Sequence, residues 1–153
     1  MALRSTTTAP ALVVDAALVA KWAFPEAGGP AARRVFVAWA GGRVELVAPD
    51  LLVPELAALC RQKAARGELP VAQAPTVHGL LLEALPHLVP SRQLADGALA
   101  LALRHGRPTA EMLHLALALR EGCAYVTADE RVFRELAPVF PCVRHLDDVG
   151  EGF

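Results

Sequence analysis

The chain of 153 residues has few cysteines and no long apolar run. The three cysteines are scattered through apolar segments at Cys60, Cys123 and Cys142. This distribution argues against a disulfide framework or a zinc site, and it favours reduced thiols in a cytoplasmic protein. No apolar segment reaches the roughly 18 residues of a membrane span. Asp15 interrupts the first apolar run, so residues 1–9 are predicted to be a disordered tail, not a signal peptide, ahead of one domain over residues 10–149.

The chain also lacks an excess of either charge. Its 15 Lys and Arg residues against 16 Asp and Glu residues give a formal net charge of −1, so no global basic field indicates nucleic acid. Neither a Gly-x-Gly-x-x-Gly sequence nor a P-loop occurs, which argues against a doubly wound nucleotide-binding or phosphotransfer domain. Apolar residues make up 54% of the chain and charged residues 20%, which is typical of a globular domain.

Short apolar segments alternate with helical patterns along the whole chain. The predicted strands are residues 12–14, 43–48, 86–90, 123–127 and 142–146. The predicted helices are residues 17–22, 30–40, 51–66, 69–85, 91–106 and 110–120, with another opening after Asp129. Asp50 is placed as the N-cap of the helix that starts at Leu51. The alternation predicts an α/β fold, a three-layer α/β/α sandwich with a central, mainly parallel sheet.

Asp15 stands where the first strand ends and the first helix begins. Residues 12–14 are apolar and lack alternation, which favours a strand buried on both faces of a parallel sheet. Ligands of open α/β sheets bind outside the carboxyl ends of the strands. An aspartate at this place is also a common helix N-cap, and the segment alone fits both interpretations.

Three further acidic residues, Glu55, Glu111 and Asp129, lie at strand ends or in the first turn of helices. Right-handed crossovers collect such positions at one end of a parallel sheet. Carboxylates held together repel one another, and Mg²⁺ or Mn²⁺ relieves the repulsion with oxygen ligands. The chemistry that fits is metal-assisted phosphodiester hydrolysis, in which the cation lowers the pKa of a water molecule. Capping and the helix dipole offer a structural alternative for each residue.

Four segments resemble the motifs of PIN-domain ribonucleases. The first is Asp15-Ala-Ala-Leu-Val-Ala-Lys-Trp22 and the second is Ala48-Pro-Asp-Leu-Leu-Val-Pro-Glu55. The third is Thr109-Ala-Glu-Met-Leu-His-Leu-Ala-Leu-Ala118 and the fourth is Val126-Thr-Ala-Asp-Glu-Arg131. Their order and spacing hold from about residue 11 to residue 146, and the second and fourth motifs together are the most specific.

The chain is most similar to the VapC-type toxins of toxin–antitoxin pairs. The resemblance implies a Mg²⁺- or Mn²⁺-dependent endoribonuclease that forms a homodimer or a higher even oligomer, is inhibited by a cognate antitoxin and needs no membrane. It places the metal-binding and catalytic acids at Asp15, Glu55, Glu111 and Asp129. Thr127 would join them as a catalytic residue by hydrogen bonding to an aspartate, a water or the phosphate; a buried strand threonine is the alternative.

Two residues depart from the family's pattern. Glu111 stands where the third motif usually has aspartate, and its extra methylene displaces the carboxylate. Because Mg²⁺ demands near-ideal octahedral geometry, this change would weaken metal binding or shift the preference toward Mn²⁺. Ala17 replaces a small polar residue and offers no hydrogen bond. The alternative function is therefore a catalytically weak or inactive PIN-fold module that binds RNA or a partner protein.

Other candidates have simpler explanations. The five histidines show no metal-ligand spacing. His114 lies one turn after Glu111 and replaces an aromatic residue common in the family, which favours packing. Trp22 and Phe24 could stack RNA bases, but core or dimer packing is the preferred interpretation. The basic residues nearest the acids could contact RNA phosphates or simply be solvated surface: Lys21, Arg61, Lys63, Arg66 and Arg131.

Overall fold

A five-stranded parallel sheet forms the centre of the protein. The computed structural model describes residues 9–25, 28–149 and 152. The strands are β1 (Ala11–Val14), β2 (Glu45–Pro49), β3 (His87–Val89), β4 (Ala124–Thr127) and β5 (Val143–His145). Their order is β3-β2-β1-β4-β5 and every neighbouring pair is parallel, which confirms the predicted sheet. The predicted tail falls almost wholly on residues 1–8, outside the described residues, and the domain limits stay a prediction.

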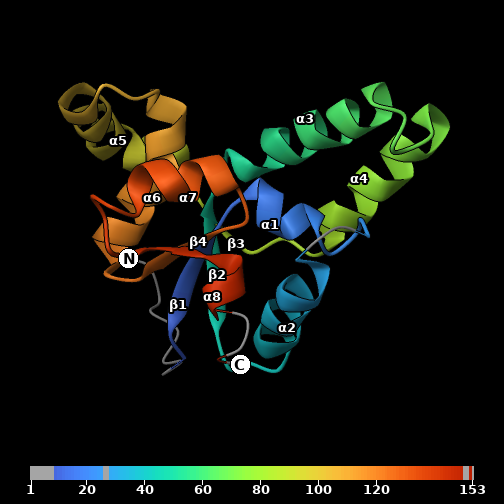
Figure 1. The fold of residues 1–153 in the computed structure, drawn as a ribbon, viewed down its shortest axis with the longest axis horizontal. Coiled ribbons are helices and arrows are strands. Elements are labelled where there is room, and N and C mark those ends of the chain that lie inside the picture. Colours follow the sequence, from blue (N-terminus) through green and yellow to red (C-terminus); the bar gives the residue numbers. More distant parts are fainter. Residues whose placement is uncertain (1–8, 26–27, 150–151, 153) are drawn as a thin grey trace.

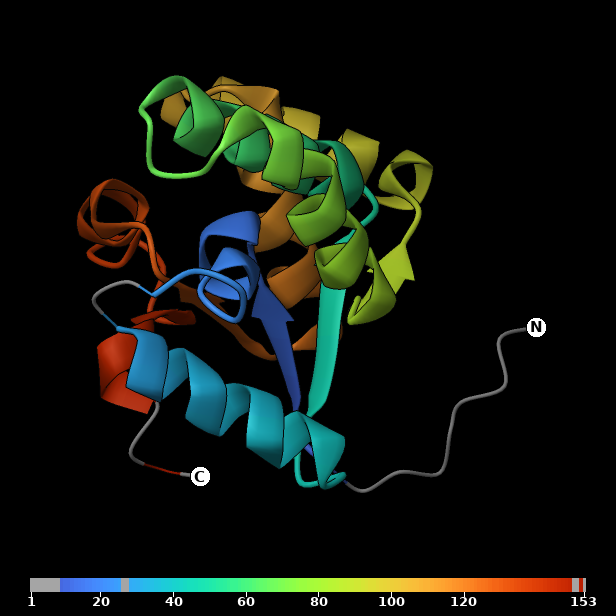
Figure 2. The same ribbon diagram turned by 90° about the vertical axis from the view of Figure 1, so that its right-hand side faces the viewer.

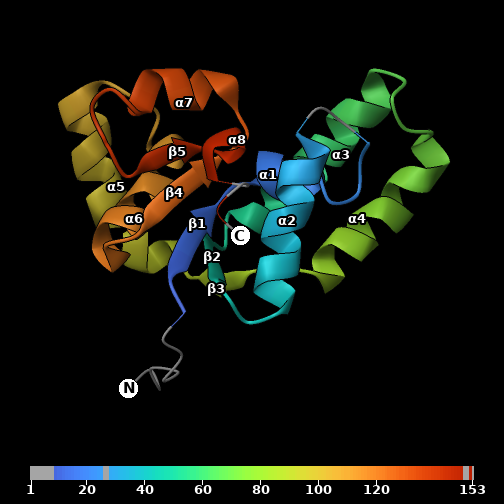
Figure 3. The same cartoon turned by 60° about the horizontal axis from the view of Figure 1, so that its bottom comes forward.

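Helices cover both faces of this sheet, as the α/β/α prediction requires (Figures 1 and 3). The helices are α1 (Ala16–Ala20), α2 (Gly29–Ala40), α3 (Leu52–Ala65), the 3₁₀ turn η1 (Val71–Gln73), α4 (Ala74–Glu83), α5 (Ser91–His105), α6 (Thr109–Glu121), α7 (Glu130–Leu136) and α8 (Leu146–Val149). One apolar cluster joins α1, α2, α3 and α8 to the sheet, and another joins α5, α6 and α7. Figure 2 shows α2 as a separate helix beside the amino-terminal half of β1 and β2.

The middle strand is buried on both faces, as its sequence predicts. Val13 belongs to the cluster under α5 and α6, whereas Leu12 and Val14 belong to the cluster under α1 and α2. Both Val13 and Val14 are 0% exposed. Burial on both sides fixes the register of β1, and it therefore fixes the position of the residue that follows it.

The predicted cap at Asp50 is wrong. Leu51 is the N-cap residue of α3 and makes no side-chain capping bond. The Asp50 carboxylate instead accepts hydrogen bonds from the backbone N–H and the hydroxyl of Ser91, the first residue of α5. Because β2 and β3 are neighbours, the carboxylate reaches the helix that follows β3 and ties its start to the end of β2.

The long helix predicted over residues 69–85 is broken. The structure has the short turn η1 and then α4, with Pro75 in the first turn of α4. Proline has no N–H to donate and is tolerated only in the first turn, so the α-helix begins just before it. The hairpin of α3 and α4 extends away from the sheet in Figure 1. No helix in the described part of the chain is long and apolar enough to cross a bilayer.

Candidate active site at the carboxyl ends of β1 and β4

Asp15 is a buried carboxylate at the junction of β1 and α1. Its side chain is the N-cap of α1, because Oδ1 accepts the Leu18 N–H at 3.0 Å. The residue is only 7% exposed, yet it lines a pocket of about 300 Å³. Asp15 is therefore both the N-cap of α1 and a residue of the pocket.

Two side chains of β4 hold the second oxygen of Asp15. Oδ2 accepts the Tyr125 hydroxyl at 3.2 Å and a short hydrogen bond from the Thr127 hydroxyl. Val13 pairs with Tyr125 in the parallel register, so the next residues on the same face are Asp15 and Thr127. The sheet register thus brings together residues that are more than a hundred positions apart in sequence.

Asp129 joins this group through the same threonine. The Asp129 N–H donates to Thr127 Oγ1 at 3.0 Å. Its side chain caps α7, where Oδ1 accepts the N–H groups of Arg131 and Val132 at 2.9 and 3.1 Å. Thr127 therefore links two carboxylate-bearing segments, which is one of the roles that its place in the sequence suggests.

All four predicted acids line the same pocket. It is formed by Asp15, Ala16, Ala17, Glu55, Ala58, Leu59, Gln62, Glu111, His114, Tyr125, Asp129, Arg131 and Val132. We call this the acidic pocket. Its wall at position 17 is an alanine, so no hydroxyl or amide enters the pocket from that point of α1.

Two carboxyl groups of the acidic pocket resist ionisation. Burial raises the pKa of Asp15, while the hydrogen bonds from Thr127 and Leu18 act in the opposite direction. Burial, and then the charge of Asp15, raise the pKa of Glu55 to about 7. A pair of carboxyls with raised pKa values is the electrostatic signature expected of a site that is completed by a cation.

Glu111 differs from the other acids because arginines already neutralise it. Arg131 donates to one of its oxygens at 2.7 Å and Arg107 to the other at 3.1 Å. Both arginines also pair with Glu135 of α7. This ion network, Arg107–Glu111–Arg131–Glu135, joins the start of α6 to α7 at the edge of the acidic pocket.

His114 faces the acidic pocket from α6. Its ring stacks on Tyr125, with ring centroids 5.5 Å apart and planes 16° from parallel. The packing role expected from the sequence is therefore present. The ring is 3% exposed, and burial lowers the pKa of His114 to about 4, so the imidazole is neutral at physiological pH.

The donor set of the acidic pocket suits a divalent cation. Asp15, Glu55 and Asp129 supply carboxylate oxygens, the ligands that Mg²⁺ and Mn²⁺ prefer. Within residues 9–25 and 28–149, no three His, Cys, Asp or Glu side chains are already arranged to hold a metal ion. Binding would therefore require side chains of the acidic pocket to move toward one another, while Thr127 and Tyr125 hold Asp15 in place.

Sequence reasoning missed Tyr125 and the ion network. Tyr125 precedes Thr127 by two positions on a strand, so the alternation of strand side chains places both on one face. That signal was available in the sequence. In the ion network, Arg107–Glu111 and Arg131–Glu135 have the i,i+4 spacing that the sequence could show. The pairs Arg107–Glu135 and Arg131–Glu111 join distant segments, and no local pattern points to them.

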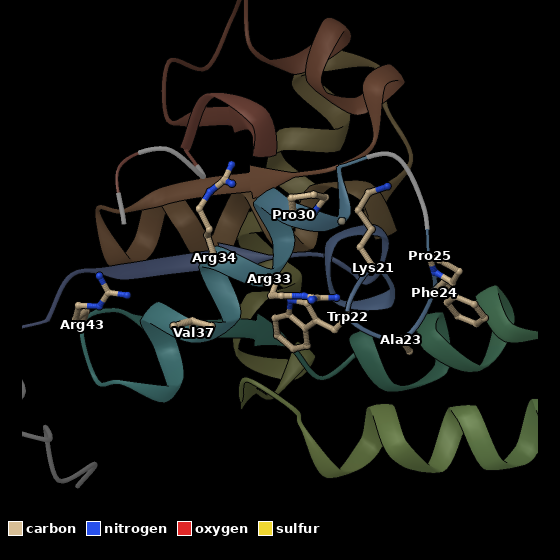
Figure 4. A pocket seen from close by; sticks show the side chains of 11 residues that line it. Lys21, Trp22, Ala23, Phe24, Pro25, Pro30, Arg33, Arg34, Val37 and Arg43 are labelled. Atoms are coloured by element: carbon tan, nitrogen blue, oxygen red, sulfur yellow. The ribbon is translucent and has the colours of Figure 1, made fainter.

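Basic residues continue from the acidic pocket along α1 and α3. A small adjoining pocket shares Ala17, Leu59 and Gln62 with it and adds Lys21, Lys63 and Arg66. Lys21 also lines another pocket, of about 880 Å³, where it is joined by Arg33 and other residues of α2 (Figure 4). We call these two pockets the basic track. Trp22 packs in it beside Phe36 and Trp39.

Comparison with known proteins agrees with this geometry. The sequence profile of the PIN domain matches residues 12–138. No curated protein sequence gives a significant match. The fold is similar to the crystal structure of PAE2754 from Pyrobaculum aerophilum, with a TM-score of 0.70 and 17% identity over 97% of this chain and 92% of that chain. The chain belongs to the PIN domain family.

Proposed function

We propose that this protein is a metal-dependent endoribonuclease that hydrolyses RNA phosphodiester bonds. One observation carries the proposal: Asp15, buried at the end of the central strand, lines one pocket with Glu55, Glu111 and Asp129. Membership of the PIN domain family supports a nuclease. The four segments that resemble the family's motifs each contribute one acid to this pocket. RNA as substrate and Mg²⁺ or Mn²⁺ as cofactor rest on the resemblance and on the donor set.

The four acids would contribute unequally to cation binding. Asp15, Glu55 and Asp129 would hold it, and Glu111 would reach it only by releasing an arginine of the ion network. When bound, the cation supplies a water of lowered pKa and offsets charge on the scissile phosphate. No side-chain nucleophile is needed in this mechanism.

Thr127 acts as a positioning residue. Its hydroxyl donates to Asp15 and accepts from the Asp129 N–H, so it fixes two of the proposed ligands relative to each other. Tyr125 restrains the same Asp15 oxygen from the neighbouring position on that face. Pre-set carboxylates lose little freedom when a cation binds, which favours affinity.

We further propose a biological role as the toxin of a toxin–antitoxin pair. The support is the motif resemblance to VapC-type toxins. A cognate antitoxin and a homodimer, or a higher even oligomer, are part of this proposal. Exposed apolar side chains such as Val37, Leu80 and Leu103 provide surface for such contacts, since they are 53%, 57% and 77% exposed.

The direct test is cleavage of RNA by the purified protein with Mn²⁺ or Mg²⁺. Asp15→Asn keeps an acceptor for the Leu18 N–H and nearly the same volume, so the fold should persist. We expect it to lose at least about a hundredfold in rate, the scale on which a metal-site charge matters. Asp96→Asn, on the exposed face of α5, is the matched control and should cleave like wild type. Equal activity of Asp15→Asn and wild type would refute the proposal.

The alternative is a PIN-fold module that binds RNA or a partner without cutting it. Two observations favour it: the ion pairs of Glu111 with Arg107 and Arg131, and the missing polar group at Ala17. Calorimetric titration with Mn²⁺ separates the two functions. The nuclease requires affinity that disappears in Asp15→Asn, whereas the module predicts no carboxylate-dependent affinity in either protein.

A further inference from the structure

His114 places a nitrogen atom in the acidic pocket that the protein leaves without a partner. Its Nε2 is fully buried and makes no hydrogen bond. The other described side-chain nitrogens in this condition belong to His78, Arg107 and His145, and none of these residues lines the acidic pocket. A buried imidazole nitrogen without a hydrogen bond is costly, so a missing partner is indicated.

A carboxyl group of the proposed metal site lies close to this nitrogen. Nε2 lies 3.7 Å from Glu55 Oε2, which is too long for a hydrogen bond. The gap is short enough for one cation bonded at about 2.1 Å to each atom, the usual length of metal–imidazole and metal–carboxylate bonds. The stack on Tyr125 fixes the plane of the ring, and Tyr125 in turn donates to Asp15.

We propose that His114 Nε2 is a nitrogen ligand of the metal site, and that it makes the site select first-row transition-metal dications over Mg²⁺. Imidazole binds these borderline cations well, whereas Mg²⁺ prefers oxygen and gives up water reluctantly. A neutral imidazole that carries its proton on Nδ1 offers the Nε2 lone pair to a cation. The inference rests on the proposed function, because it uses the same pocket and names the class of metal that the pocket takes.

The test measures metal ligation without RNA. Metal-free full-length protein is loaded with Mn²⁺, and pulsed electron paramagnetic resonance reads nitrogen couplings to the bound ion. We expect a ¹⁴N coupling in wild type that is replaced by a ¹⁵N coupling when histidine is labelled with ¹⁵N. The coupling should vanish in Asp15→Asn, which locates the ion in the acidic pocket. This arm needs no substitution at His114.

The matched variants are His114→Phe and His105→Phe. His105 packs its ring on Phe140 outside the pocket, so its substitution changes a similar ring contact only. We expect His114→Phe to lose the nitrogen coupling and about tenfold or more in Mn²⁺ affinity, with Mg²⁺ affinity changed less than about threefold. His105→Phe should keep the coupling and both affinities.

The possible failures are distinguishable. Mn²⁺ bound in an Asp15-dependent way without a nitrogen coupling overturns the inference, because all ligands are then oxygens, and leaves the proposed nuclease intact. Equal losses of Mn²⁺ and Mg²⁺ affinity in His114→Phe also overturn it, since the ring then acts only by packing. Absence of any Asp15-dependent metal affinity overturns both the inference and the proposed function.

Discussion

Asp15 shows how a single residue serves the fold and the site together. One oxygen caps α1 and the other accepts from Tyr125 and Thr127, so both are occupied within the protein. The sequence predicts the position of Asp15 but leaves cap and functional acid as alternatives. The local sequence cannot distinguish the two roles, because the contacts of Asp15 with Tyr125 and Thr127 come from β4, which lies next to β1 only in the folded sheet.

The raised pKa of Glu55 gives a prediction about stability. Its pKa moves from 4.5 to about 7, so between these values the folded protein holds a proton that the unfolded chain has released. The free energy of unfolding therefore falls as pH rises through this window. The Glu55→Gln variant has no carboxyl group to ionise at this position, so its stability does not fall as pH rises through this window. Since the side chain is 34% exposed, we expect a gain of about 1–2 kcal/mol above pH 7 and none below pH 4.5.

The measurement is the difference in unfolding free energy between Glu55→Gln and wild type, both metal-free, from pH 4 to pH 8. The difference is needed because His114 acts in the opposite direction in both proteins. Burial lowers the pKa of His114 from 6.5 to about 4, so the folded protein loses stability as pH falls through this range. Subtracting the wild-type curve removes this contribution. Glu83→Gln, on the exposed side of α4, is the control and should give a flat difference. A flat difference for Glu55→Gln would contradict the assigned pKa.

At the scale of elements, the sequence predicts the strand–helix alternation well and the contacts between elements poorly. The left-handed glycines that end α5 and α6, Gly106 and Gly122, are visible as local stop signals. The partner of Asp50 is not, because Ser91 lies 41 residues away and meets it only after β3 pairs with β2. Local chemistry sets where elements end, and pairing sets which side chains meet.

The ion network between α6 and α7 leads to a prediction for Glu111. Its carboxylate is bonded to two arginines, so we expect Glu111→Gln to lower the free energy of unfolding by about 1 kcal/mol at low salt, and less at high salt. Mn²⁺ affinity should change less than about threefold, since the other acids remain. Thermal melts at two salt concentrations and a Mn²⁺ titration check both expectations.

The control for this variant lies at the other end of the same helix. Glu121 pairs with its exposed neighbour Arg120, so Glu121→Gln removes an ion pair of α6 without touching the network. It should leave stability and Mn²⁺ affinity unchanged. A loss of more than about tenfold in Mn²⁺ affinity in Glu111→Gln would show that Glu111 leaves its arginines for the cation.

At the scale of the molecule, parallel topology is what makes a site from scattered acids. Every strand of the described sheet runs the same way, so β1 and β4 deliver Asp15, Thr127 and Asp129 to one end. The sequence predicts this gathering from the alternation of elements alone. It does not predict that two arginines neutralise Glu111, because Arg131 lies 20 residues away and meets Glu111 only in the folded protein.

The basic track next to the acidic pocket supports the proposed nucleic-acid substrate. The net charge of −1 gives no attraction over long range, so phosphates must be met locally. Arg66 and Arg33 are exposed on α3 and α2 and line the two pockets of the track. An RNA strand that leaves the acidic pocket along α1 would pass both arginines.

The track predicts a measurable salt dependence. The test uses the Asp15→Asn background, in which cleavage is expected to be slow. The logarithm of the affinity for a fluorescent single-stranded RNA is followed against the logarithm of salt concentration. Arg66→Gln and Arg33→Gln should each weaken binding and lower the magnitude of the slope by about 0.7, the value for one lost phosphate contact. Arg104→Gln, exposed on α5 and outside the track, should leave the slope unchanged. Identical slopes in all three variants would place the RNA elsewhere on the protein.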